Sequence, residues 1–167
     1  IDADVVHRLA RWRNADGELR RVSHLSYVQR VLGAMTEYDY PEITLETEQG
    51  EQARGAMALV FNLPRYGMGL PFTPEARGDD ALLDWVVFER KGLIHLADYA
   101  WSVLRTRHLG RPDVPNGRAA SIRLTARTPV PLQADGDAIG FTPQRIEVRP
   151  GALRVVEPLD PSVSGRD

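Results

Sequence analysis

The fold is most readily inferred from the stretch Pro129-Val-Pro-Leu-Gln-Ala-Asp-Gly-Asp137, which is followed closely by Gln144-Arg-Ile-Glu-Val-Arg-Pro-Gly-Ala-Leu-Arg-Val-Val-Glu-Pro158. The first stretch predicts a short apolar strand that ends in the acidic turn Asp135-Gly136-Asp137, because Asp-Gly after strand-forming residues is a strong turn signal. The second stretch predicts a β-hairpin that bends at Pro150-Gly151. Short strands joined by tight turns indicate an antiparallel sheet, since parallel strands need a long crossover connection.

Size and composition restrict the class of protein. The chain has 167 residues, 43% hydrophobic and 26% charged, with a formal net charge of −2, which predicts one folded domain with a core. The slightly acidic balance argues against nucleic acid as a partner. The absence of cysteine excludes disulfides and thiol chemistry, and no apolar run approaches the ~20 residues of a membrane span. We therefore expect a cytoplasmic protein.

Apolar residues at helical spacing predict three helices, over Asp4–Arg13, Ser23–Met35 and Leu93–Leu104. In the third helix we expect an apolar stripe to face the core, and this stripe consists of Leu93, Leu96, Ala97, Ala100, Trp101 and Leu104. Trp101 is therefore expected in the core and not at a membrane surface.

Strands are predicted where the hydrophobic period changes to two or where a short run is mostly apolar. These segments are Glu42–Thr47, Ala56–Leu63, Leu82–Phe88, Ser121–Ala126, Val130–Ala134, Arg145–Val148 and Leu153–Val156. Pro64–Asp80 is rich in glycine and proline and predicts a long ordered loop. We expect a mainly β (α+β) fold, an antiparallel β-sandwich decorated with about three helices, over residues 1–158, with residues 159–167 as a tail.

The acidic turn Asp135-Gly136-Asp137 has two interpretations. On local sequence alone it is a hairpin turn, which is the commoner meaning of Asp-Gly between strands. Alternatively, a carboxylate held at a strand end by a glycine turn can act as a general base on a substrate hydroxyl.

A second group of residues lies in the segment from Phe61 to Asp84. It is either a Gly/Pro loop with solvated acids or a clip for a divalent ion. Hard cations take oxygen ligands, and the carbonyls of Arg77 and Leu82 with the Asp80 side chain have workable spacing for such a clip.

The order of these segments resembles that of the diacylglycerol kinase and sphingosine kinase superfamily of lipid kinases. That superfamily has an Asn-x-x-x-Tyr-Gly-Gly-Gly loop, then Pro-x-Ala, then Asp-Asp-Gly-Leu-Leu-Asp, and much later an Asp-Gly-Glu turn. The corresponding stretches here are Asn62-Leu-Pro-Arg-Tyr-Gly-Met-Gly69, Pro74-Glu-Ala76, Asp79-Asp-Ala-Leu-Leu-Asp84 and Asp135-Gly-Asp137. The opening Ile1-Asp-Ala-Asp-Val5 also looks like the family's Gly-Phe-Asp-Ala-x-Val, so the resemblance covers about residues 1–158.

The resemblance implies a role for each candidate residue. Asp135 is expected to accept the proton of a lipid hydroxyl, and Asp137 to contact the cofactor. Asp80, with the carbonyls of Arg77 and Leu82, is expected to hold a structural Mg²⁺ ion. The implied cofactors are Mg²⁺ and ATP, and the implied substrate is a lipid such as diacylglycerol.

The resemblance also implies a second domain. In these kinases ATP lies largely on an N-terminal α/β domain with a glycine-rich phosphate-binding segment, and this chain contains no such segment. We therefore expect the chain to be the C-terminal domain of a longer polypeptide, with the N-terminal ATP-binding domain as its partner. As an isolated fragment it is expected to be inactive.

Three residues depart from the family pattern. Asp137 stands where glutamate is usual, Met68 interrupts the glycine triplet, and Ala81 replaces the glycine after Asp80. If position 81 needs a positive φ, alanine there is strained by on the order of 1 kcal/mol.

Basic residues form two clusters, one of Arg8, Arg11, Arg13, Arg20 and Arg21, the other of Arg105, Arg107, His108 and Arg111. They are either solvated helix faces or contacts to an anionic membrane, which would make the protein peripheral at the membrane.

Two other functions stay open: a non-catalytic β-sandwich module that binds lipid or a partner, and a NAD kinase-like enzyme. The four histidines lack the His-x-x-x-His spacing of a zinc site.

Overall fold

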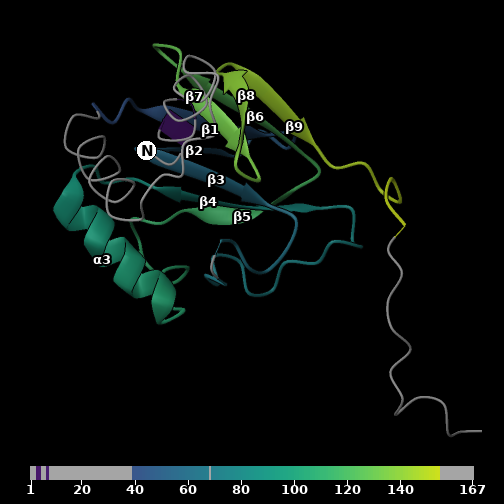
Figure 1. The fold of residues 1–167 in the computed structure, drawn as a ribbon, viewed down its shortest axis with the longest axis horizontal. Coiled ribbons are helices and arrows are strands. Elements are labelled where there is room, and N and C mark those ends of the chain that lie inside the picture. Colours follow the sequence, from purple (N-terminus) through teal and green to yellow (C-terminus); the bar gives the residue numbers. More distant parts are fainter. Residues whose placement is uncertain (1–2, 5–6, 8–38, 68, 155–167) are drawn as a thin grey trace, which may run out of the picture.

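The computed structural model describes residues 3–4, 7, 39–67 and 69–154 (Figure 1). This part of the chain is mainly β, as predicted. Its strands are β1 (Ile43–Thr47), β2 (Gln52–Gly55), β3 (Met57–Phe61), β4 (Leu83–Phe88), β5 (Asn116–Ala119), β6 (Ser121–Ala126), β7 (Pro131–Ala134), β8 (Asp137–Phe141) and β9 (Gln144–Glu147), and its helix is α3 (Leu93–Leu104).

The strands form two packed sheets and a hairpin. One sheet has the order β2-β1-β6-β9, the other has the order β3-β4-β5, and β7 pairs with β8. Every pairing between these strands is antiparallel. A shared core between the two sheets contains Leu45 of β1, Trp85 of β4 and Ile122 of β6, each almost fully buried. The predicted antiparallel β-sandwich is therefore confirmed.

β4 is the central strand, and all six of its residues are buried. Successive side chains of a strand point to opposite faces of the sheet. Trp85 and Val87 accordingly join the core between the sheets, whereas Val86 and Phe88 pack with residues of α3 on the other side. The apolar run of β4 follows from this burial on both faces, and α3 covers the outer side of the three-stranded sheet (Figure 1).

The bounds predicted for α3 are confirmed, but the predicted buried stripe is wrong. The helix buries Tyr99, Ser102 and Val103, while Trp101 is 57% exposed and Leu104 is 58% exposed. The tyrosine ring lies against Phe88, with 4.7 Å between the ring centroids. Hydrophobicity alone ranks tryptophan and leucine above tyrosine and serine. A prediction based on it therefore assigned to the core the face of α3 that is exposed in the structure.

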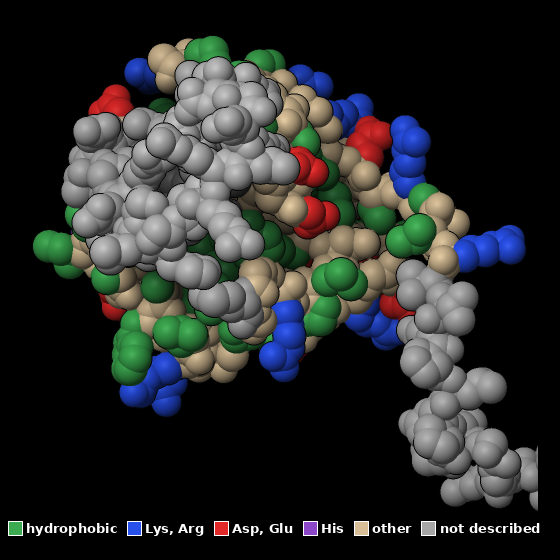
Figure 2. Space-filling model, viewed as in Figure 1, with side chains coloured by type: hydrophobic (Ala, Val, Ile, Leu, Met, Phe, Trp, Pro, Cys, Tyr) green, Lys and Arg blue, Asp and Glu red, His purple; other side chains and the backbone are tan. Residues whose placement is uncertain are grey.

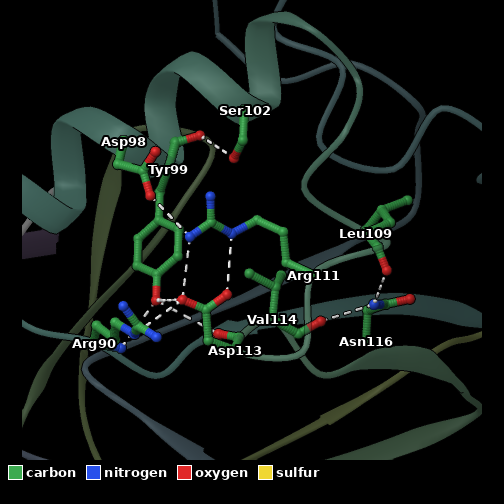
Figure 3. A network of polar contacts seen from close by, with 9 residues as sticks. All are labelled: Arg90, Asp98, Tyr99, Ser102, Leu109, Arg111, Asp113, Val114 and Asn116. Atoms are coloured by element: carbon green, nitrogen blue, oxygen red, sulfur yellow. Dashed lines mark hydrogen bonds and ion pairs between the residues drawn. The ribbon is translucent and has the colours of Figure 1, made fainter.

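Polar contacts explain why Tyr99 can be buried (Figure 3). Its hydroxyl donates to the Asp113 carboxylate over 3.1 Å and accepts the backbone N–H of Arg90 over 3.1 Å. Arg111 binds the same carboxylate with two nitrogens, at 3.0 and 3.2 Å. The phenol is thus satisfied inside the protein, as burial of a polar group requires.

Several strand predictions need correction. The strand predicted over Ala56–Leu63 is β3, which is shorter than expected and runs from Met57 to Phe61. β2, β5 and β8 were not predicted at all. Residues 150–151 do form a turn, but Leu153 and Arg154 are not in a strand, and Leu153 is 80% exposed. β9 was expected to pair with the strand predicted over Leu153–Val156, and it pairs with β6 instead.

The other predicted helices fall mostly outside the described residues. Asp4 and His7 are helical, as predicted for the first helix, and Ala3, just before its predicted start, is helical too; the remaining residues of that helix are not described. The predicted helix over Ser23–Met35 and the tail over 159–167 also lie outside the described part. Among the described residues, no helix is long and apolar enough to cross a membrane.

Candidate functional site

The acidic turn joins β7 to β8 as a two-residue hairpin loop. Asp135 has φ 50° and Gly136 has φ 93°, and Ala134 pairs with Asp137 across the loop. Two consecutive positive φ angles define the type I′ turn that Asp-Gly favours in hairpins. The turn interpretation is therefore confirmed. Both carboxylates are exposed at the tip of the hairpin, so the turn also presents them to solvent.

Gln133 joins this turn to the loop that follows β3. Its Nε2 donates to the Tyr66 hydroxyl over 2.7 Å, and its Oε1 accepts the backbone N–H of Gly136 over 2.8 Å. A register shift between Leu132 and Gln133 interrupts the β7–β8 pairing at this point, and such irregularities re-aim side chains. Two of the segments singled out in the sequence are thus held together by one side chain.

The loop after β3 is ordered by an aromatic cluster. The Phe61 ring lies 5.4 Å from that of Phe72 and 5.8 Å from that of Tyr66, between centroids. Tyr66 and Leu70 also exchange two backbone hydrogen bonds of 2.9 Å. The prediction of a long ordered loop is confirmed, and its glycines at 67 and 69 have positive φ angles of 53° and 88°.

The N-terminal part of the chain contacts the same hairpin. His7 Nε2 donates to the carbonyl of Leu132 over 2.7 Å, and its ring lies 5.0 Å from that of Phe141 on β8. Position 7, the loop at 66 and the hairpin at 132–141 are far apart in the sequence. They meet on the β7–β8 hairpin.

The predicted metal clip lies at a separate place, just before β4. Asp80 Oδ1 accepts the backbone N–H of Leu82 over 3.0 Å, and the residue between them, Ala81, has φ 62°. The suspected need for a positive φ at position 81 is therefore confirmed. The Arg77 side chain lies 3.2 Å from Asp79 and is exposed, so only its backbone carbonyl is relevant to a cation.

Arg118 of β5 is the partner of Asp80 that sequence reasoning missed. Its Nη2 contacts Asp80 Oδ2, and its Nε lies 3.5 Å from Asp84 Oδ1. Arg118 stands directly across from Asp84 in the β4–β5 pairing. Because β5 was not predicted, no signal in the sequence could place the arginine beside these carboxylates.

Asp84 has an oxygen that its surroundings leave unsatisfied. The residue is 8% exposed, and its Oδ2 is buried without a hydrogen-bond partner among the described residues. Burial raises the pKa of the Asp84 carboxyl, although the charge of Arg118 opposes this effect. The unsatisfied oxygen and the carboxylate of Asp80 are hard donors, which suits Mg²⁺ chemically.

A cation at Asp80 would share that carboxylate with Arg118. Among the described residues, no three His, Cys, Asp or Glu side chains gather closely enough to bind a metal ion by themselves. Backbone carbonyls would therefore have to supply further ligands, which is the arrangement expected from Arg77 and Leu82.

A family model matches almost the whole chain. The sequence model of the YegS C-terminal NAD kinase beta sandwich-like domain matches residues 3–157. The chain is 28% identical over 112 residues to "Putative lipid kinase YtlR" of Bacillus subtilis (strain 168). These aligned residues cover 67% of this chain and 36% of that protein.

Solved structures show the same fold. Two structures of a putative diacylglycerol kinase from Bacillus anthracis str. Sterne superpose with TM-scores of 0.56 and 0.57, at 20% and 18% identity. They cover 72% and 80% of this chain, and 41% and 46% of their own length. The chain therefore spans less than half of the proteins that it matches.

Proposed function

Since the chain belongs to the family of YegS C-terminal NAD kinase beta sandwich-like domains, we propose that it is the substrate and base domain of a diacylglycerol kinase-like lipid kinase. The intact enzyme would transfer the γ-phosphate of ATP to a lipid hydroxyl. Support comes from YtlR, which is named "Putative lipid kinase", and from the solved structures, which are named "putative diacylglycerol kinase".

The observation that carries the proposal is the junction at Gln133, which ties the acidic turn to the loop containing Tyr66. In the sequence these are the Asp-Gly and Tyr-Gly motifs of the lipid kinases. A base must be held within reach of the proton that it accepts, and a tight hairpin fixed by a side-chain bridge supplies that rigidity.

Asp135 would carry out the proton transfer. Its carboxylate would accept the proton of the lipid hydroxyl as that oxygen attacks the γ-phosphorus and the bond to the β-phosphate oxygen breaks, releasing ADP. Phosphoryl transfer depends chiefly on positioning and on neutralised phosphate charge, so one base suffices on this domain. Asp137, which begins β8 beside the turn, would contact the bound cofactor.

Asp80 would hold Mg²⁺ with the backbone carbonyls of Arg77 and Leu82. The ion would supply positive charge that orders the segment before β4. That positive charge would also stabilise the carboxylate of Asp84, whose Oδ2 has no hydrogen-bond partner among the described residues. Arg118 already provides part of it, so the site is proposed as structural and takes no part in the transfer step.

ATP would lie mainly on an N-terminal domain of a longer polypeptide, so the chain alone would not phosphorylate lipid. The shares of 36%, 41% and 46% of the matched proteins leave room for such a domain. The intact protein would work in the cytoplasm at the membrane surface, where its lipid substrate lies.

The experiment is lipid-dependent ATP turnover by the full-length protein, with and without Asp135→Asn. Asparagine tolerates the positive φ at this position, so the variant should keep the turn. We expect turnover to fall by about 10² to 10⁴, the usual contribution of a general base. Near-normal turnover by a variant with an unchanged thermal midpoint would remove Asp135 from the mechanism.

A second candidate is a non-catalytic module that binds lipid or a partner. The residues at Met68, Ala81 and Asp137 favour it, because each departs from the kinase pattern. It predicts vesicle binding by the full-length protein without ATP turnover. The third candidate, a NAD kinase-like enzyme, is tested in the same assay with NAD in place of lipid, since the family description includes NAD kinase.

A further inference from the structure

The outer face of α3 is apolar and uncovered among the described residues. Four of the eight exposed large hydrophobic side chains of the described chain lie on this one helix: Leu93 at 42%, Ile94 at 83%, Trp101 at 57% and Leu104 at 58% exposure. In an α-helix, residues seven and ten positions apart share a face. Ile94, Trp101 and Leu104 therefore form one surface, opposite the buried Tyr99 and Val103.

Such a grouping differs from ordinary surface hydrophobics. Single exposed apolar residues are common and need no explanation, whereas grouped ones mark an interaction site. Hydrophobic side chains gather over α3 at the lower left of Figure 2, with basic side chains beside them. We call this surface, made of Leu93, Ile94, Trp101 and Leu104, the outer face of α3.

Basic residues border the outer face of α3. The Arg105 guanidinium lies 4.4 Å from the centre of the Trp101 ring, and Lys91 and Arg107 are exposed before and after the helix. Asp98, the acidic residue within the helix, forms an ion pair of 2.8 Å with Arg111. Its charge is thus compensated, and the border keeps a positive charge.

A tryptophan beside exposed aliphatic side chains and a rim of lysine and arginine is the composition of a surface that lies in a lipid interface. The apolar side chains would enter the boundary between headgroups and acyl chains. The basic rim would contact anionic headgroups. Arg105, whose guanidinium stacks on the Trp101 ring, would extend toward those headgroups, as long basic side chains do at interfaces. The positive rim makes an anionic surface a better match than an uncharged protein surface.

We propose that the outer face of α3 docks the protein on an anionic membrane. The inference deepens the proposed function and rests on it for the lipid substrate, but the docking itself is measured independently of turnover.

The test is sedimentation of the full-length protein with phosphatidylcholine vesicles that contain or lack phosphatidylglycerol. We expect binding to the anionic vesicles that weakens with added salt. Trp101→Ser with Leu104→Ser, and separately Arg105→Glu with Arg107→Glu, should each reduce the partition constant by at least about tenfold. Leu153→Ser and Arg127→Glu are matched controls, since both residues are exposed and lie away from α3.

Tryptophan emission provides a second readout. The chain has a third tryptophan, Trp12, so the measurement uses a Trp12→Phe background. Trp85 is 1% exposed and should not respond to vesicles, whereas Trp101 should shift its emission to the blue on docking. Trp101→Phe should keep vesicle binding and lose that shift. Unchanged partition of both double variants would overturn the proposal. A dimer that dissociates with Trp101→Ser, or a Trp101 protected from iodide quenching without vesicles, would overturn it too, by assigning the face to a second copy or to another domain.

Failure of docking and failure of the kinase reaction give different results. If docking is right, the α3 variants lose turnover on vesicles and keep it on detergent-dispersed lipid, while Asp135→Asn binds vesicles normally. If the protein has no kinase activity, vesicle binding by the α3 variants still decides whether this face docks.

Discussion

Gln133 Nε2 donates a hydrogen bond of 2.7 Å to the hydroxyl of Tyr66, although 67 positions separate the two residues in the chain. The same side chain accepts the Gly136 backbone N–H through Oε1. One amide therefore connects the loop after β3 with the tip of the β7–β8 hairpin. Its loss should affect both the stability of the domain and the placement of Asp135.

The stability effect is tested with Tyr66→Phe and Gln133→Leu. Tyr66→Phe removes the hydrogen bond to Gln133 and should lower the free energy of unfolding by about 1 kcal/mol. Gln133→Leu removes the hydrogen bonds to Tyr66 and Gly136 and should cost more, about 1–3 kcal/mol. Urea unfolding measures both, with the exposed Gln144→Leu as a control. Equal stabilities for Gln133→Leu and the control would show that the bridge does not hold the hairpin.

The positioning role of Gln133 is tested by turnover in the full-length protein. We expect Gln133→Leu to lower kcat more than it raises the KM for ATP, because the proton acceptor is less well placed while ATP would lie mainly on the N-terminal domain. A purely structural role would leave kcat per folded molecule as it is in the unmodified protein.

Ala81 occupies a left-handed conformation, with φ 62°, between Asp80 and Leu82. A side chain in this conformation destabilises the folded state by roughly 1–2 kcal/mol. Glycine avoids that cost, but its greater entropy stabilises the unfolded state by roughly 0.4–1 kcal/mol. Ala81→Gly should therefore raise the free energy of unfolding by up to about 1 kcal/mol. Ala138→Gly on β8 is the control and should destabilise, because glycine weakens a strand. A destabilised Ala81→Gly would contradict the strain argument.

The proposed Mg²⁺ site gives a prediction that needs no activity assay. Millimolar Mg²⁺ should raise the thermal midpoint of the chain, because a ligand that binds only the folded state stabilises it. The rise should be larger in Arg118→Ala, which removes the guanidinium that competes for Asp80. Asp80→Asn should abolish it, and Asp135→Asn should not. If Mg²⁺ changes the thermal midpoint of none of the four proteins, the proposed site is wrong and Arg118 is the cation that neutralises Asp80.

Sequence patterns predicted the elements whose burial follows a simple period. β1 alternates buried and half-buried residues, and both β6 and α3 have the bounds expected from their patterns. β5 escaped prediction because Asn116-Gly-Arg-Ala119 has no strand-like composition and is a strand only through its pairing with β4. The buried face of α3 depended on Asp113, which satisfies the hydroxyl of Tyr99 from another segment.

The site was predictable to a similar degree. The order of motifs identified Asp135 and Asp80 as candidates, and the Asp-Gly pair predicted the turn. Gln133 and Arg118 carried no local signal, because each acts through a partner more than thirty residues away. Residues of that kind become visible only when the fold brings the segments together.

Asp113 makes the stability of the domain depend on pH. Its carboxylate is 7% exposed and binds Arg111, Tyr99 and Arg90, the last over 3.1 Å (Figure 3). The hydrogen bonds from Arg111, aided by that from Tyr99, lower the pKa of Asp113 to about 2, although desolvation opposes them. A depressed pKa stabilises the folded state above the pKa of the unfolded chain, about 4. That contribution is lost as the pH falls from about 4 to 2.

We therefore expect the free energy of unfolding to lose roughly 1–2 kcal/mol from Asp113 over this pH interval. Asp113→Asn should be less stable at pH 7 and should lack that part of the acid dependence. Asp84 acts with the opposite sign, because its raised pKa means that stability is lost as the pH rises through it. Asp84→Asn should thus steepen the acid loss while Asp113→Asn flattens it. Urea titrations at pH 2 to 7 measure both slopes, and parallel curves for the unmodified protein and Asp113→Asn would refute the assignment.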